Sequence, residues 1–161
     1  MKYPEFVGKL KSQTAKLEHE RKLSLSIEIC KKLFFDYQQF ANENNWGNPD
    51  LLLDAINLSQ KALIREIETT QAKSLLVKID EISPDAEEFT DASYALNACT
   101  AVYETLEFIL DNKSEHIYNI ATYLTDTVYL KIKEKVDLTD DQVDNHPLMI
   151  ETRRFLLEAT R

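Results

Sequence analysis

The stretch that decides the fold is Ala92–Leu110, which reads ASYALNACTAVYETLEFIL. Most of its residues are apolar, it contains neither Gly nor Pro, and its only charges are Glu104 and Glu107. At about 3.6 residues per helical turn, its polar positions fall in a single row. That row consists of Ser93, Asn97, Thr100, Glu104 and Glu107. The remaining surface is apolar around most of the circumference, which is typical of a helix packed between neighbours. We therefore expect an all-α fold in which helix 92–110 is central.

Amphipathic patterns on both sides of this stretch predict further helices. The longest runs from about Glu18 to about Glu43, and its apolar residues recur at helical spacing in the series Leu23, Ile27, Cys30, Phe34, Tyr37 and Ala41. We expect this helix to be the main packing partner of the central one. Shorter patterns predict helices over about 4–17, 49–69, 72–82, 115–136 and 146–161. No segment alternates polar and apolar residues as strands do, so no sheet is expected.

These patterns together predict a single-domain helical bundle of about seven helices over residues 1–161. A hydrophobic content of 43% with 29% charged residues is ordinary for a globular chain. The chain contains only two Gly and four Pro, which favours long helices and few tight turns. A short acidic turn, DDQVDN, precedes the last predicted helix.

The junction Asn44–Asp50, NNWGNPD, is the clearest break between two predicted helices. Gly47 accommodates a positive φ, Asn48 is a good N-cap, and Pro49 suits the first turn of the next helix. Trp46, the only tryptophan, lies in this junction. Two interpretations stay open. Trp46 either folds back as a lid on the end of the bundle, or it stacks on a ligand or anchors a partner.

The charge and the apolar runs of the chain limit its partners and its location. A net charge of −9 disfavours binding to nucleic acids and to anionic membrane surfaces. No apolar run approaches the about 20 residues of a membrane span, and the first residues contain no apolar signal-peptide core. Cys30 and Cys99 lie in apolar helical patterns, which is typical of buried thiols in a reducing compartment. We therefore expect a cytoplasmic protein that binds neither nucleic acid nor membrane.

The chain lacks the residue patterns that carry common chemistry. It has no Gly-x-Ser-x-Gly, no phosphate-binding Gly loop and no Glu-x-x-His pair of the kind found in carboxylate-bridged metal bundles. Segment Asp137–His146 resembles a calcium loop, but it lacks the central Gly, and Leu148 stands where the final Glu ligand belongs. Cys99 shares its helix with Glu104 and Glu107, which oppose thiolate formation. We predict no catalytic residue, no metal site and no cofactor, and an enzyme is the less favoured class.

The polar seam of the central helix is the one constellation that could carry a site. Its candidate contact residues are Asn97, Thr100, Glu104 and Glu107, and Trp46 is the candidate outside it. Two carboxylates three residues apart perform acid–base chemistry if burial raises their pKa toward neutrality. The alternative is that the seam faces water or pairs with Lys or Arg of a neighbouring helix.

Several corner and core motifs together resemble the YjaG-like family of uncharacterised bacterial proteins, a domain of unknown function. The resemblance lies in the junction Trp46-Gly47, in IDEISPDAEEF over 79–89, in YALNACTAVYETLEFIL over 94–110 and in the acidic turn LTDDQVDNHP. It spans nearly the whole chain but contains no catalytic signature. The resemblance implies a small all-helical single domain and supplies no activity and no site residue.

Two hypotheses of function follow from these observations. The first is a cytoplasmic helical interaction or adaptor protein without catalytic activity, which binds a protein partner or forms a homodimer. The second is a small-molecule-binding protein or enzyme whose pocket between helices is lined by Glu104 and Glu107. An exposed seam beside an apolar patch favours the first hypothesis, and a seam that faces a cavity favours the second.

Overall fold

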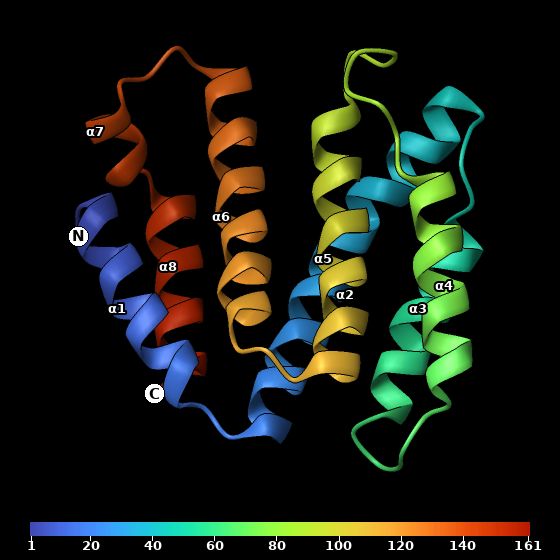
Figure 1. Ribbon diagram of the computed structural model, residues 1–161. Coiled ribbons are helices and arrows are strands. Elements are labelled where there is room, and N and C mark those ends of the chain that lie inside the picture. The colour runs from blue at the N-terminus through green and yellow to red at the C-terminus, as the bar shows by residue number, and fades with distance from the viewer.

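The computed structural model describes residues 1–161, and every regular element in it is a helix (Figure 1). The central element is α5, Ala92–Asp111, which contacts α2, His19–Asn44, more extensively than any other helix and α6, Glu115–Lys135, next. Residues of α5 are buried along its whole length, from Ala92 to Phe108. The all-α fold and the central position of helix 92–110 are therefore confirmed.

The remaining helices lie on two sides of this centre. On one side, α3 and α4 pack on α2 and α5, and on the other side α1 and α8 pack on α6 (Figure 1). The bounds of these helices are α1 Tyr3–Lys16, α3 Pro49–Lys61, α4 Thr69–Ile82, α7 Asp140–Asp144 and α8 Pro147–Ala159. The structure thus has eight helices, because the acidic turn before the last helix is itself the short helix α7. Thr139 caps α7 with its side chain, and Gln142 bonds back to the backbone of Thr139.

The predicted helix 49–69 is too long. The structure ends α3 at Lys61 and begins α4 at Thr69, three residues before the predicted start of helix 72–82. The amides of Leu63 and Ile64 bond to carbonyls three residues back, which tightens the chain into a turn and stops the helix. Ile64, which the predicted helix 49–69 includes, lies in this turn and is 86% exposed.

One continuous core joins α1 to α6 and α8, and a small separate cluster lies under α7. The separate cluster consists of Val128, Ile132, Val143 and Met149. Cys30 and Cys99 are free and buried, as expected, and burial raises the pKa of each thiol to about 12. No helix combines the length and the apolar character that crossing a membrane requires.

The junction between α2 and α3 is fixed by one buried phenol. Tyr37 donates a hydrogen bond to the carbonyl of Ile82 at 2.8 Å and accepts one from the backbone N–H of Asn48 at 3.1 Å. Gly47 has a φ of +84°, and a Cβ built on it would lie 2.4 Å from the Tyr37 oxygen. Asn48 then caps α3 through the N–H of Leu51, as its sequence position predicts. Both the positive φ and the close approach therefore require Gly at position 47.

We expect Gly47→Ala to destabilise the protein by about 2 kcal/mol or more, because the new Cβ is strained and meets the Tyr37 hydroxyl. Gly8→Ala is the matched control. Gly8 lies inside α1, and a Cβ there meets nothing within 4 Å. The control should stabilise by about 0.5–1 kcal/mol, since Ala is the better helix former. Urea unfolding measures both, and equal effects of the two substitutions would contradict the role of Gly47.

Candidate functional site

Asn97 and Glu104 of the polar seam face α6, whereas Ser93 is exposed, and Glu104 makes the most hydrogen bonds of the seam. Glu104 is 9% exposed, and its carboxylate meets three partners from α6. Tyr123 donates its phenol to Oε1 at 2.6 Å, and Asn119 donates its amide to Oε2 at 3.0 Å. The Nδ1 atom of His116 lies 3.0 Å from the same Oε2. Three donors offset the cost of removing this carboxylate from water.

His116 extends the network from Glu104 to the end of α5. Its Nε2 lies 3.0 Å from Oδ2 of Asp111, and its Nδ1 also lies 3.7 Å from Oε2 of Glu107. Both ring nitrogens therefore face carboxylate oxygens, and both act as donors only in the imidazolium form. The group of residues Glu104, Glu107, Asp111, His116, Asn119 and Tyr123 is called the His116 cluster below.

The pKa shifts in the His116 cluster follow from burial and from its charges. Burial lowers the pKa of His116, but hydrogen bonds and charges from Asp111 and Glu104 outweigh it and raise the pKa above the ordinary 6.5. Burial raises the pKa of Glu107, an effect that the His116 charge opposes. Burial also raises the pKa of Asp111, but the bonds from His116 and from the Lys113 backbone reverse the sign and lower it. Burial and then Glu104 raise the pKa of Tyr123.

The other predicted site residues make separate contacts inside the fold. Asn97 donates its amide to the Thr127 hydroxyl of α6 at 3.0 Å, and Thr100 donates to the carbonyl of Leu96 at 2.8 Å. Trp46 lies at the other end of α5. Its ring packs at a centroid distance of 5.2 Å from Phe89, which precedes that helix, and at 6.0 Å from Phe40. The structure therefore joins Glu104 with Glu107 and leaves Trp46 outside the seam.

Sequence reasoning missed the half of the cluster that α6 contributes. His116, Asn119 and Tyr123 lie three and four residues apart, so they occupy one face of a helix. The sequence therefore contains two polar rows, one on α5 and one on α6, and their pairing could have been predicted from this pattern.

The His116 cluster is a hydrogen-bonded network between α5 and α6 that combines three carboxylates with an imidazole, an amide and a phenol. No group of three or more His, Cys, Asp or Glu side chains has the geometry to hold a metal ion. The main surface hollow lies elsewhere, in a groove of about 700 Å³ between α3 and α4. The cluster therefore connects α5 to α6, and the groove is the better candidate for contact with another molecule.

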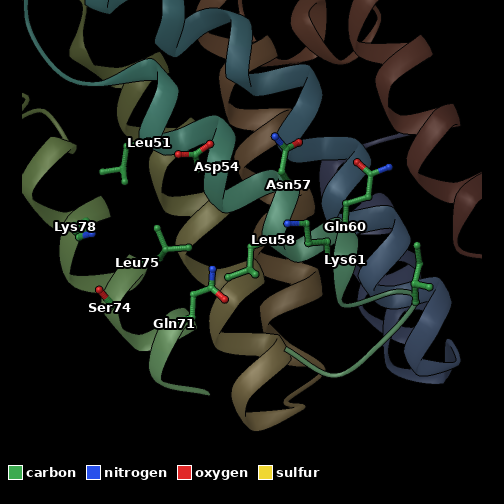
Figure 2. Close-up of a pocket in the computed structure, with 11 residues that line it drawn as sticks. Leu51, Asp54, Asn57, Leu58, Gln60, Lys61, Gln71, Ser74, Leu75 and Lys78 are labelled. Carbon is green, nitrogen blue, oxygen red and sulfur yellow. The ribbon is translucent and has the colours of Figure 1, made fainter. Parts of the chain in front are cut away.

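The α3–α4 groove has an apolar floor and a polar rim. Leu51 and Leu58 of α3 and Leu75 of α4 contribute apolar side chains, and Figure 2 shows them facing one another across the gap. The rim carries Lys61 and Lys78, neither of which forms an ion pair within the chain. The other polar lining residues are Asp54, Asn57, Gln60, Gln71 and Ser74.

Comparison with known proteins gives a family and a fold. The model of a family described as a protein of unknown function, DUF416, matches residues 9–160. The fold is similar to the crystal structure of a DUF416 family protein from Shewanella baltica OS155, with a TM-score of 0.80 and 24% sequence identity. That similarity covers 92% of this chain and 82% of the Shewanella chain. No curated protein matches the sequence.

We expect Glu104→Gln to destabilise the protein by about 1–3 kcal/mol, because it removes the negative charge that three part-buried side chains of α6 hydrogen-bond. Glu107→Gln is the matched control on the same helix. Glu107 is more exposed and makes only a longer contact with His116, so its substitution should change stability by less than about 0.5 kcal/mol. Urea unfolding distinguishes the two. A small effect of both would restore the interpretation of a merely solvated seam.

We expect His116 to make stability depend on pH. Its pKa is raised in the folded protein, so its contribution is complete below the unfolded value near 6.5 and is lost as pH rises through the folded pKa. Unfolding of the wild type and of His116→Gln should be compared from about pH 5 to about pH 9. The stability difference between them should shrink as pH rises. His19 and His146 are present in both proteins, so the difference in stability reports on His116 alone. A difference that grows with pH would contradict a stabilising imidazolium at His116.

Proposed function

The chain belongs to the DUF416 family, whose function is unknown, and we propose that it is a helical interaction module that binds a protein partner on its α3–α4 face. The supporting observation is the combination of the α3–α4 groove, with its apolar floor, and an exposed apolar side chain at its edge. Ile64, in the turn that follows α3, lines the groove and is 86% exposed. Apolar side chains that gather at a groove are typical of a binding surface.

The shape and charge of the groove favour an amphipathic helix as the bound element. Two packed helices leave a channel between them into which a third helix fits with its apolar stripe down. Lys61 and Lys78 stand on the rim without acidic partners, so acidic residues beside the apolar stripe complement them. The proposed partner therefore presents a helix with an apolar stripe flanked by Glu or Asp.

The seam of α5 gives less support to the small-molecule or enzyme hypothesis. Both Glu104 oxygens already accept hydrogen bonds from α6, and Asn97 is paired with Thr127. A ligand would have to displace these donors to reach either residue. A contact role for Trp46, Asn97, Thr100, Glu104 and Glu107 stays a prediction, and the proposed interaction does not depend on it.

The narrower sequence-based expectations are part of this proposal. We propose a YjaG-like protein that acts in the cytoplasm as a single domain over residues 1–161 and without binding nucleic acid. The net charge of −9 supports the last of these points. A homodimer is the alternative way to cover the α3–α4 face, and the experiment below distinguishes it.

We expect a photoactivatable amino acid at position 64, at the edge of the groove, to cross-link the partner in cells. Val136, 54% exposed after the end of α6, is the control position and should give no such product. Mass spectrometry of the product should identify an amphipathic helix with acidic residues. A cross-link to a second copy of the chain would show a homodimer in place of a different partner. An equally strong product from position 136 would contradict the α3–α4 groove as the binding surface.

Ile64→Asp should weaken partner binding by about tenfold or more, because it places a charge at the apolar edge of the groove. Val136→Asp should leave binding unchanged. Both substitutions replace exposed apolar residues, so both variants should retain the wild-type unfolding midpoint. Lys61→Glu tests the proposed charge on the partner, and tighter binding by that variant would contradict an acidic helix.

A further inference from the structure

A second hollow, of about 280 Å³, lies on the other side of the molecule from the α3–α4 groove. Four helices contribute to it. They are α1 through Tyr3, α6 through Asp126 and Tyr129, α7 through Asp140 and Asp144, and α8 through Met149 and Arg153. We call it the Arg153 pocket. Its volume suits a ligand about as large as an amino acid.

The carboxylates of this pocket are not all paired. Asp144 is occupied, since Oδ1 accepts a bond of 2.6 Å from Arg153 Nη2 and Oδ2 one of 3.2 Å from the Tyr3 amide. Asp140 accepts only the Tyr129 phenol, at 2.9 Å. Asp126 lies at an exposed position of α6 and has no hydrogen-bond or ion-pair partner. Two carboxylates therefore face the pocket without a cation.

Arg153 provides a second and independent observation that points to a ligand. It is 6% exposed, and its Nη1 donates to the carbonyl of Met1 at 3.0 Å. Its Nε is the one buried side-chain nitrogen or oxygen that has no hydrogen-bond partner. A buried N–H without an acceptor is costly, and a ligand oxygen supplies one.

The aromatic side chains of the pocket suit a cation as well. The Tyr3 ring lies 5.7 Å from the guanidinium of Arg153, and Tyr129 contributes a second ring to the lining. Aromatic faces attract ammonium groups. Tyr3 is 45% exposed near the start of α1, whereas the Phe6 ring, 5.2 Å from the same guanidinium, is buried.

We propose that the Arg153 pocket binds a small zwitterion of the amino-acid class. Its ammonium group lies between Asp126 and Asp140, and its carboxylate accepts a hydrogen bond from Arg153. The lining residues carry three carboxylates against one guanidinium, so a ligand with only a negative charge is repelled by the pocket. A ligand with only a positive charge leaves the Arg153 Nε unpaired. The proposed site is independent of the partner surface on α3 and α4.

Saturation-transfer NMR with matched probes tests the charge pattern. The probes are glycine, γ-aminobutyrate and ε-aminocaproate, each compared with the alkylamine and the carboxylate of the same chain length. At least one amino acid should receive saturation from the protein, while its amine and carboxylate counterparts receive much less. Equal binding of an amine would overturn the zwitterion in favour of a simple cation, and the absence of any signal would overturn the site.

Substitutions then place the bound probe. Asp126→Asn should weaken binding about tenfold or more, because it removes the charge that faces the ammonium group. It should fold normally, because Asp126 has no partner to lose. Asp137→Asn, at an exposed carboxylate outside the pocket, is the matched control and should bind like the wild type. Arg153→Lys should weaken binding of the amino acid more than binding of the amine, because only the amino acid has a carboxylate for Arg153. Undiminished binding by Asp126→Asn would contradict the assignment.

Discussion

The requirement to bury α5 on nearly all sides governs the rest of the structure. Its apolar residues are covered by α2 and α6, with α3 and α4 completing the enclosure. A helix enclosed in this way has room for polar side chains only where a neighbour offers partners. The seam meets that condition, since Asn97 finds Thr127 and Glu104 finds three donors, all on α6. Polar pairing thereby selects which face of α6 packs on α5.

Glu104 illustrates why such a seam specifies packing more than it adds stability. Removing a carboxylate from water costs several kcal/mol, and its hydrogen bonds in the folded protein offset most of that cost but add little net stability. Any register of α6 that moved Asn119 or Tyr123 away would leave the Glu104 carboxylate desolvated and without these hydrogen bonds. The cation that completes this network is a histidine, so its strength varies within the physiological pH range. The seam therefore constrains the register of α6 on α5, and the strength of this constraint depends on the protonation of His116.

The sequence predicts those features that depend on one helix at a time. The central helix, its partner 18–43 and the capping at Asn48 all follow from local spacing and turn chemistry, and the structure confirms them. The partners of Glu104 depend on which helix lies opposite, and periodicity within α5 contains no information about that. The end of α3 was mistaken for the same reason. Ile64 continues the apolar spacing, but the chain turns away from the core before reaching it.

The two outer layers differ in how firmly they are packed, and this difference bears on the proposed sites. The α3–α4 pair is anchored in the main core through Leu58 and Leu75, so the groove between them is a preformed surface. The α7 region rests on a separate cluster of four residues, and Arg153 ties it to the first residues of the chain. Segments with few buried contacts open at lower free energy than the core does. A ligand that bridges Asp126, Asp140 and Arg153 would connect α6, α7 and α8, and its binding energy would add to the stability of this region.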